Sequence, residues 1–347
     1  MEEGIMQHEH KTDRHIRTSI IDVAKRAGVS PSTVSRVING TATVSSDKKR
    51  LVEAAIQDLN FEPNRFARSL IINRSEIIGV IIDRSIRYAT ANVLVQLEEH
   101  AASRGYMSMV FTIDRPFHDN LQTLLAKYNS VSIDGLIVIA PRTGLPEQVA
   151  KADINIPVVV ISSQLEDIGV PMVGEDQYQG AYKMVNFLAG LGHKQIWHVS
   201  GGMDWFDEQQ RRRGWNDALL DHGLSANRKD LRAGSWNPQK TYEMMQKADL
   251  STAPDAIFVA SDHMAMAAIA ALKSRGIAVP KDISVVGYDD TEGAEYASSP
   301  LTTVLQDLPF VARKAVELLI NMIDGEEVPM VTRIEPKLIV RESAIAR

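Results

Sequence analysis

The sequence predicts an α/β protein in which a small helical domain precedes a larger part built on parallel β-sheets. Two short amphipathic segments flank a glycine near the amino terminus, and from residue 77 onward short β-branched segments alternate with amphipathic ones. Domains commonly hold about 100–200 residues, so a chain of 347 residues suits two or three of them. We expect a disordered tail at 1–17, a helix-turn-helix headpiece at 18–62, a hinge or linker at 63–74 and a core at 75–347.

The charge of the chain is unevenly distributed. The formal net charge is −6, yet residues 17–74 carry +5 and residues 75–347 carry −9. A basic module on an acidic body is typical of a DNA-binding headpiece, although a solvated helix face has a similar charge pattern. The absence of cysteine excludes disulfides and thiolate metal sites. No apolar run nears the roughly 20 residues of a membrane helix, and the polar start lacks the apolar core of a signal peptide.

The first predicted helix covers residues 19–27. Ser19 is placed to cap its amide groups, and Asp22 lies in the first turn, where the helix dipole favours an anion. Gly28 follows, and its tolerance of left-handed backbone angles predicts the end of the helix there. One apolar stripe is formed by Ile20, Val23, Ala24 and Ala27.

Two further helices are predicted at 31–38 and at about 47–59. The former begins with a Ser30 cap and with Pro31 at a position where the missing N–H is not needed. It turns Val34 and Val37 inward and leaves on its outer face Ser32, Thr33 and Arg36. The latter is expected to close a three-helix core with Leu51, Ala54, Ala55 and Leu59. Short helices joined by a glycine turn indicate a helix-turn-helix, whose second helix enters the major groove of DNA; a plain helical bundle is the alternative.

The headpiece motif is long enough to indicate a family. Residues 20–40 read IIDVAKRAGVSPSTVSRVING, which resembles the headpiece signature of the lactose-repressor (LacI/GalR) family. The resemblance implies that Pro31 and Ser32 occupy variable base-reading positions and that Arg36 reads a base edge, most often that of guanine. The other DNA-contacting residues, which mostly meet the DNA backbone, are expected to be Ser19, Ser30, Thr33, Ser35 and Asn39.

Residues 60–74 resemble the hinge helix of the same family. A helix this short is marginal in water and is expected to order on DNA or against a dimer mate. By the resemblance, Ala67 allows close approach and Leu70 wedges between base pairs in the minor groove, while Arg65 and Arg68 lie near phosphates. A plain interdomain linker is the alternative.

The core sequence predicts alternating strands and helices. Strands are expected at 77–82, 107–112, 136–140, 158–162, 196–200, 257–260 and 284–288. Amphipathic helices are expected near 93–104, 120–130, 179–191, 207–222, 238–248, 263–275 and 309–323. This alternation indicates parallel sheets with helices on both faces.

The family resemblance continues through the core at 211–215, 261–265, 282–290 and 299–304. It implies a two-lobed, periplasmic-binding-protein-like fold with chain crossovers near Val173, Val304 and Val331. The N-lobe is then about 75–172 and 304–331, and the C-lobe about 173–303 and 332–347. A ligand in such a fold lies between the lobes at the carboxyl ends of the strands, and the lobes close about a hinge.

The resemblance implies a small sugar as the ligand, and a galactoside, glucoside or cellobiose is expected. Sugars are held by planar hydrogen-bonding groups and an aromatic face, which Arg211, Asp289 and Trp236 can supply. By position these three match sugar-binding residues of the family, and Gln306 matches a further cleft residue. The remaining expected ligand-binding residues are Ser162, Trp205 and Ser261. The two serines replace other polar residues of the family, so the sugar's stereochemistry stays open.

Each of these residues has an alternative interpretation. Arg211 and Asp289 can form an ion pair between the lobes, Trp236 can be ordinary packing, and Trp205 can be a cleft wall or a surface cap. An enzyme is a competing class, but the common phosphate-binding, metalloprotease and nucleophile-elbow motifs are absent from the sequence. Adjacent acids such as Asp289 and Asp290 cannot flank a scissile bond at the roughly 5–9 Å that glycosidases need.

We therefore expect a transcription regulator, in the mode of a repressor, that is not an enzyme and has no cofactor or metal. Its expected partners are a pseudo-palindromic operator in double-stranded DNA, a small sugar effector and a second copy of the chain, without a membrane. A dimer is expected because no leucine heptad follows residue 342. The expected location is the bacterial cytoplasm, at the nucleoid. The alternatives are a sugar-binding protein or a sugar-acting enzyme without specific DNA binding.

Overall fold

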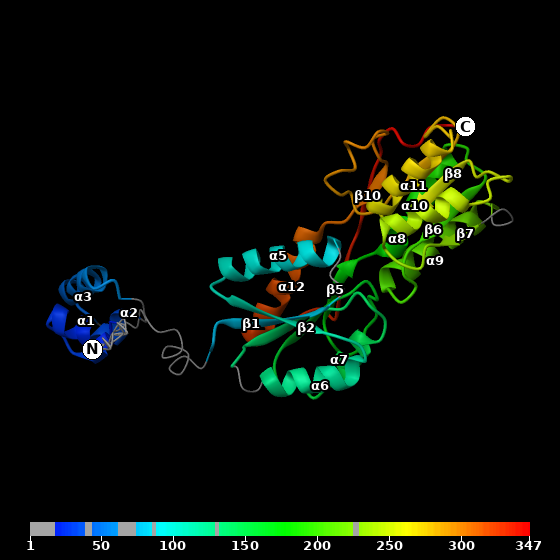
Figure 1. The fold of residues 1–347 in the computed structure, drawn as a ribbon. Helices are drawn as coiled ribbons and strands as arrows, with labels where there is room; N and C mark the ends of the chain where they lie inside the picture. The colour runs from blue at the N-terminus through cyan, green and yellow to red at the C-terminus, as the bar shows by residue number, and fades with distance from the viewer. Residues whose placement is uncertain (1–17, 39–43, 62–73, 85–87, 129–131, 225–228) are drawn as a thin grey trace, which may run out of the picture. The chain divides into compact units, whose positions relative to one another are not determined.

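The computed structural model describes residues 18–38, 44–61, 74–84, 88–128, 132–224 and 229–347 (Figure 1). The chain divides into two compact units, Met1–Ser75 and Glu76–Arg347. The first unit is helical and the second is α/β. Within the described ranges, every helix is too short or too polar to cross a membrane.

The first unit packs three helices, α1 (Ile20–Ala27), α2 (Pro31–Ile38) and α3 (Ser46–Asp58), around a small apolar core. Ser19 caps α1 as predicted: the Asp22 amide donates to Ser19 Oγ, and the Ser19 amide donates to Asp22 Oδ2 at 2.9 Å. Ser19 Oγ also donates to Asp22 Oδ2 at 2.7 Å, and this bond together with the one from the Ser19 amide lowers the pKa of the Asp22 carboxyl. Gly28, with φ at 68°, ends α1 in the left-handed conformation that was predicted.

The predicted inward face of α3 is wrong for two of its four residues. Leu51 is 51% exposed and Ala54 is exposed, whereas Val52 is fully buried together with Ala55. Val52, Ala55 and Leu59 follow the spacing of one helix face, and this face meets the apolar side of α1. Residues 51, 52, 54, 55 and 56 are all apolar, so the sequence is compatible with burial of either of two adjacent faces of α3. Contact with α1 decides which face is buried.

The second unit begins with a six-stranded parallel sheet in the order β11-β5-β4-β3-β1-β2. Its strands are β1 (Ile77–Asp83), β2 (Met107–Ile113), β3 (Gly135–Ile139), β4 (Val158–Ile161), β5 (Met172–Glu175) and β11 (Val331–Ile334). Helices cover both faces (Figure 1), with α5 (Tyr88–Ser103) and α12 (Leu308–Ile323) on one and α6 (Phe117–Tyr128) and α7 (Leu145–Lys151) on the other.

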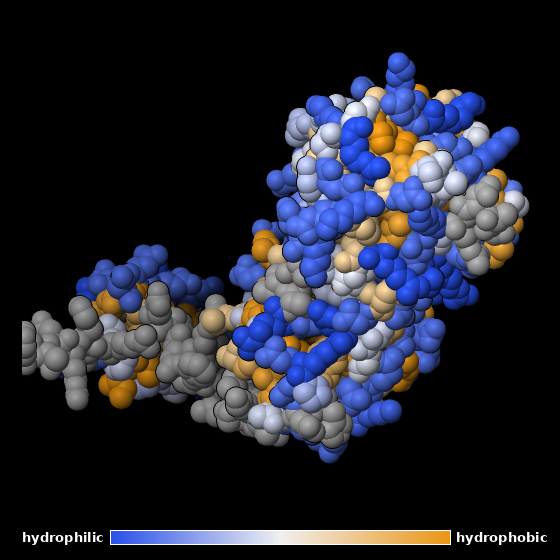
Figure 2. Space-filling model, turned by 45° about the vertical axis from the view of Figure 1, so that its right-hand side comes forward, coloured by the Kyte–Doolittle hydropathy of each residue, from blue (hydrophilic) through white to orange (hydrophobic). Residues whose placement is uncertain are grey.

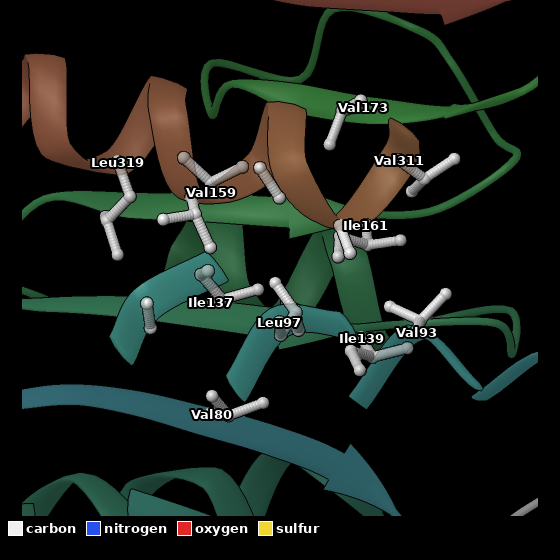
Figure 3. Packing of buried hydrophobic residues seen from close by; sticks show 14 of the residues in the cluster. Val80, Val93, Leu97, Ile137, Ile139, Val159, Ile161, Val173, Val311 and Leu319 are labelled. Atoms are coloured by element: carbon white, nitrogen blue, oxygen red, sulfur yellow. The ribbon is translucent and has the colours of Figure 1, made fainter. Parts of the chain in front are cut away.

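Aliphatic side chains fill the space between this sheet and its helices. In Figure 3, Leu97 of α5 and Leu319 of α12 lie against Ile137 and Val159 in the middle of the sheet. All four are buried, and burial of such side chains is the main favourable term in folding. Figure 2 shows a mostly hydrophilic surface on the viewed face of the core, as expected when the apolar side chains lie inside.

A second parallel sheet has four strands in the order β7-β6-β8-β9. These are β6 (Ile196–Ser200), β7 (Asp230–Arg232), β8 (Ala256–Val259) and β9 (Ser284–Val286). One face packs on α8 (Gln177–Gly190) and α9 (Phe206–Asp221), and the other on α10 (Pro238–Lys247) and α11 (Asp262–Ser274). The α/β class with two parallel sheets is therefore confirmed.

Three chain segments join the two sheets. The chain leaves the six-stranded sheet after β5 and enters α8, returns after β10 (Thr303–Leu305) into α12, and leaves again after β11 toward β12 (Lys337–Ile339). Strands β10 and β12 pair antiparallel and form a small sheet of their own. Each of the seven predicted core strands is found, whereas β5, β7, β10, β11 and β12, with three or four residues each, were not predicted.

The corrected face of α3 can be tested with neighbouring substitutions. We expect Val52→Ala to lower the free energy of unfolding of the first unit by about 1–2 kcal/mol, because it removes buried methyl groups and leaves a cavity. Leu51→Ala should change it by less than about 0.5 kcal/mol, since most of that side chain is in water. Native-state hydrogen exchange of the full chain measures both values, and the reverse order would contradict the observed packing.

Candidate functional site

The outward side of α2 carries a cluster of hydroxyl groups and one guanidinium. Ser30 Oγ lies 2.8 Å from Ser32 Oγ and 2.9 Å from Thr33 Oγ1, and the Thr33 amide donates to it at 3.3 Å. Pro31, Ser32 and Arg36 are exposed, whereas Val34 is fully buried on the opposite side. The helix therefore presents short polar groups and one arginine together, at the spacing that the sequence predicted.

The positions of the predicted DNA-contacting residues follow from this packing. Ser35 is half-buried on α2, and Ser19 is engaged in the cap of α1. Elsewhere in this unit, Arg26 of α1 forms an ion pair with Asp58 of α3 at 2.5 Å. The predicted residues Asn39, Arg65, Ala67 and Leu70 lie outside the described residues.

A cavity of about 450 Å³ lies in the second unit, between the carboxyl ends of the strands of the two large sheets. It is lined by residues that follow β3, β4, β5, β6, β8 and β9. The structure brings all seven predicted ligand-binding residues together around it: Ser162, Trp205, Arg211, Trp236, Ser261, Asp289 and Gln306. Trp205 is therefore a wall of the cavity and not a surface cap.

The floor of the cavity is organised by the Arg211 guanidinium, which is 2% exposed. Arg211 Nε donates to Gln177 Oε1 at 2.9 Å, Nη2 donates to Asp289 Oδ1 at 3.3 Å, and Nη1 donates to the Ala260 carbonyl. The Cζ atom of the guanidinium lies over the Tyr288 ring, 3.7 Å from its centre. A buried cation is costly unless it is paired and hydrogen-bonded, and these contacts meet that requirement.

Two glutamines complete a closed ring of hydrogen bonds. Gln177 Nε2 donates to Gln306 Oε1 at 2.8 Å, and Gln306 Nε2 donates to Asp289 Oδ1 at 2.6 Å. Gln177 is the first residue of α8, two residues after β5, and Gln306 directly follows β10, so both lie in segments that join the sheets. Arg211 and Asp289 both belong to the four-stranded side, so the prediction of an ion pair between lobes does not describe this pair. The connection between the sheets passes through the glutamines.

Asp289 is held in an unusual backbone conformation. Its φ is 113°, which is rare for a residue with a side chain, and its amide donates to the Val304 carbonyl at 2.9 Å. Burial raises the pKa of Asp289 to about 6, although the Arg211 guanidinium and the hydrogen bond from Gln306 act in the opposite direction. The carboxyl group is therefore mostly ionised at neutral pH and accepts hydrogen bonds.

Two indole rings form the aromatic wall. Trp205 and Trp236 meet edge to face with ring centres 5.8 Å apart. Gly201 makes room for this wall, because a Cβ there would lie 2.9 Å from the Trp236 ring. The Trp236 Nε1 atom is buried without a hydrogen-bond partner among the described residues. Trp236 thus combines a flat apolar surface with an unused donor.

The two predicted serines have structural roles in addition to their place on the cavity wall. Ser261 caps α11 and accepts a bond from the Met264 amide at 3.4 Å, and Ser162 Oγ accepts one from the Gln164 amide at 3.3 Å. Each hydroxyl still has a proton to donate, so neither role prevents contact with a ligand.

Sequence reasoning missed Glu175, Gln177, Asp207 and Tyr88, which also line the cavity. Burial raises the pKa of Asp207, which accepts a hydrogen bond from Ser163 Oγ. Glu175 ends the short buried strand β5 and Gln177 follows two residues later, so the rule that ligands bind at the carboxyl ends of parallel strands points to both once β5 is recognised. Tyr88 contacts His263 edge to face and carries no comparable sequence signal.

The cavity is equipped for binding a polar molecule. It combines one guanidinium, an ionised carboxylate, amide groups and an indole face, which can pair hydroxyl groups and cover C–H groups. Among the described residues, no three His, Asp or Glu side chains are arranged to hold a metal ion.

Comparison with known proteins agrees with both units. Residues 19–64 match the bacterial regulatory proteins of the lacI family, and residues 185–344 match a periplasmic binding protein-like domain. The repressor PurR of Pasteurella multocida (strain Pm70) is 32% identical over 335 residues, which cover 95% of this chain and 99% of that protein. PurR of Haemophilus influenzae (strain ATCC 51907 / DSM 11121 / KW20 / Rd) is 33% identical over 333 residues, which cover 94% of this chain and 98% of that protein.

Solved structures with the same fold include two ligand complexes. The lac repressor dimer bound to operator and the anti-inducer ONPF has a TM-score of 0.85 and 29% identity, over 95% of this chain and all of that chain. The complex of the transcriptional regulator CelR with cellobiose has a TM-score of 0.67 and 28% identity, over 94% of this chain and all of that chain.

The electrostatic role of Arg211 gives a measurable expectation. The positive charge of Arg211 lowers the pKa of Asp289. Arg211→Gln should therefore raise that pKa further above 6 and move the midpoint of the Asp289 titration to higher pH. Selective ¹³C labelling of aspartate carboxyls follows this by NMR. Arg212→Gln is the matched control, since Arg212 pairs with Asp230 at 2.7 Å. An unchanged Asp289 pKa in Arg211→Gln would show that the two groups are not coupled.

Proposed function

The chain belongs to the lacI family of bacterial regulatory proteins, and from that premise we propose that a small saccharide in the core cavity controls its affinity for operator DNA. As a repressor of this family it is not an enzyme. In the proposed mechanism, two copies of the chain bind a pseudo-palindromic operator through their helix-turn-helix units, and the effector changes this binding from a distance.

The DNA contact is proposed for the outward side of α2. Arg36 is exposed beside the hydroxyls of Ser32 and Thr33, and a guanidinium can donate two hydrogen bonds to the O6 and N7 atoms of guanine. The Ser32 hydroxyl is suited to a base edge, and the Thr33 hydroxyl to phosphate oxygens, which position the helix without reading the sequence. Residues 17–74 carry a charge of +5, which favours the phosphate backbone. Leu70 of the neighbouring segment is proposed as the minor-groove wedge.

The observation that carries the proposal of a saccharide is the buried ring of Arg211, Gln177, Gln306 and Asp289 beside the Trp236 face. A guanidinium and a carboxylate can each pair two adjacent hydroxyl groups. An indole face covers the C–H side of a sugar ring. A ligand that displaces bonds of this ring without supplying hydroxyls in their place would leave buried polar groups unpaired, which costs about 1–3 kcal/mol for each lost partner.

A purine base is the second candidate, because the curated relatives include PurR repressors that are 32–33% identical. A planar base can stack on an indole ring, and the Asp289 carboxylate can accept from its N–H groups. The CelR structure holds cellobiose in a protein of the same fold, which supports the saccharide. The two candidates differ in how many hydroxyl groups they offer to the buried ring.

Effector and DNA are proposed to communicate through the segments that join the two sheets. Gln177 and Gln306 lie in two of these segments and are bonded to the Arg211–Asp289 pair. A saccharide that replaces some of these bonds changes the relative stability of open and closed arrangements of the core. A ligand shifts such an equilibrium only by its differential affinity for the two states.

For the DNA contact, we expect Arg36→Ala to weaken operator binding by about tenfold to a hundredfold, because a bidentate base contact is worth about 1–3 kcal/mol. Binding to non-specific DNA should fall much less. Electrophoretic shifts with operator and scrambled duplexes at several salt concentrations measure both. Arg26→Ala is the control, since that arginine is paired with Asp58. Equal losses on both duplexes would contradict base reading by Arg36.

For the effector, we expect Asp289→Asn and Trp236→Leu to abolish the response of operator binding to saccharide while operator binding itself persists. Calorimetry of the full chain against galactosides, glucosides, cellobiose and purine bases identifies the ligand class. Arg213→Gln is the control, because that side chain is 69% exposed on α9. Heat from purines alone would replace the saccharide with the second candidate, and heat from no compound would contradict the proposed sensor.

A further inference from the structure

One buried acid in the cavity has no role in the network described above. Glu175 ends β5, lines the cavity and is 3% exposed. Its Oε1 atom accepts a hydrogen bond from the Asp307 amide at 2.5 Å. Its Oε2 atom is buried and lacks a hydrogen-bond partner among the described residues. A buried polar atom without a partner costs about 1–3 kcal/mol, so the protein keeps this group at an energetic disadvantage.

The charges around Glu175 favour its neutral form. Asp176 follows it on β5, Asp307 lies at the amino end of α12, and the single cation facing it among the groups that act on it is Arg211 of α9, whose charge is already paired with Asp289. Tyr288 also lies near enough to sense its charge. Burial, the largest cause, raises the pKa of Glu175 to about 8, so most molecules carry the proton at pH 7.

A neutral carboxylic acid is a hydrogen-bond donor, whereas the ionised group only accepts. Since Oε1 accepts from Asp307, the proton belongs on Oε2, where the protein offers it no acceptor. Glu175 lines the cavity and the terminal torsion of a glutamate side chain is broad, so the main cost of turning Oε2 toward a ligand is the loosening of the bond from the Asp307 amide to Oε1. A sugar has ring and glycosidic oxygens that can only accept, and the other acid of the ring, Asp289, cannot serve them while ionised.

We propose that Glu175 is a specificity-determining residue of the cavity and that its neutral side chain donates a hydrogen bond from Oε2 to an acceptor oxygen of the bound saccharide. This role rests on the proposed function of the cavity. Besides the expected contacts to hydroxyl groups, this contact selects for a saccharide with an acceptor oxygen at that place. It also makes effector binding dependent on pH. The effector binds the form in which Glu175 is protonated and Asp289 is ionised, so affinity is highest between about pH 6 and pH 8 and falls above pH 8 as Glu175 loses its proton.

The test is the dissociation constant of the full chain for its saccharide between pH 6.5 and 9.5, by calorimetry. In the unaltered protein the constant should rise above pH 8 by up to about tenfold per pH unit. In Glu175→Gln, whose amide donates at every pH, this alkaline rise should vanish while binding at pH 7 stays within a few-fold. In Glu175→Met, which has no donor, binding should be about tenfold weaker or more at pH 7 and also lack the rise.

Two further readouts separate this role from a structural one. Calorimetry at pH 8 in buffers of different ionisation enthalpy should detect proton uptake on binding by the unaltered protein and not by Glu175→Gln. Unchanged operator affinity in both variants establishes that they fold. Saccharide binding with the same pH profile in the unaltered protein and Glu175→Gln overturns the role of Glu175 alone. Absence of saccharide binding by the unaltered protein at every pH overturns the proposed function and this role together.

Discussion

The need to bury one positive charge determines the architecture of the cavity. The Arg211 guanidinium is almost completely removed from water, where an unpaired cation would cost several kcal/mol. Its neutralisation requires Asp289, its remaining N–H groups require Gln177 and the Ala260 carbonyl, and its flat face rests on Tyr288. These partners come from separate helices and loops of the second unit, so the floor of the cavity forms only when those helices and loops are folded together.

The acceptor that pairs with this charge has an unusual backbone conformation. Asp289 adopts a positive φ, and its amide is bonded to Val304 of β10, so the carboxylate is held toward Arg211 and Gln306. Burial raises the pKa of Asp289, and the guanidinium limits that rise enough to keep the carboxylate ionised at neutral pH. Glu175 lacks such a partner, and its pKa passes neutrality. These two acids, which both line the cavity, thus have opposite hydrogen-bonding characters, because only Asp289 is hydrogen-bonded to the Arg211 guanidinium.

Two of the segments that join the two sheets are connected to the cavity through amide side chains. Gln177 and Gln306 each use both ends of an amide group, one to the charged pair and one to each other. An amide group is neutral and can donate and accept at once, so it can change partners without becoming an unpaired buried charge itself. This property makes the pair suited to link a ligand with the chain segments that join the two sheets.

Local sequence patterns were sufficient for the helix ends of the first unit and for the longer core strands. A serine cap and a glycine stop act within one turn of the chain, and a short apolar run rich in β-branched residues indicates a buried strand without knowledge of its neighbours. The seven expected cavity residues were identified through a family motif, and the structure places them around one cavity. The prediction of the buried face of α3 was wrong for Leu51, because Leu51 and Val52 are both apolar and only contact with α1 selects Val52.

What the sequence by itself determined is therefore the class of fold, the helix-turn-helix spacing, and the residue types that a polar ligand needs. The tertiary structure alone decided which of two apolar residues in α3 is buried, which short strands form, and which acid keeps its proton. Those outcomes depend on neighbours distant in the chain: three-residue strands gain too few local contacts to form alone, and the pKa of a carboxyl group is set by the water and charges around it. Glu175 and Asp289 differ because of the space around them, which no local pattern in the chain encodes.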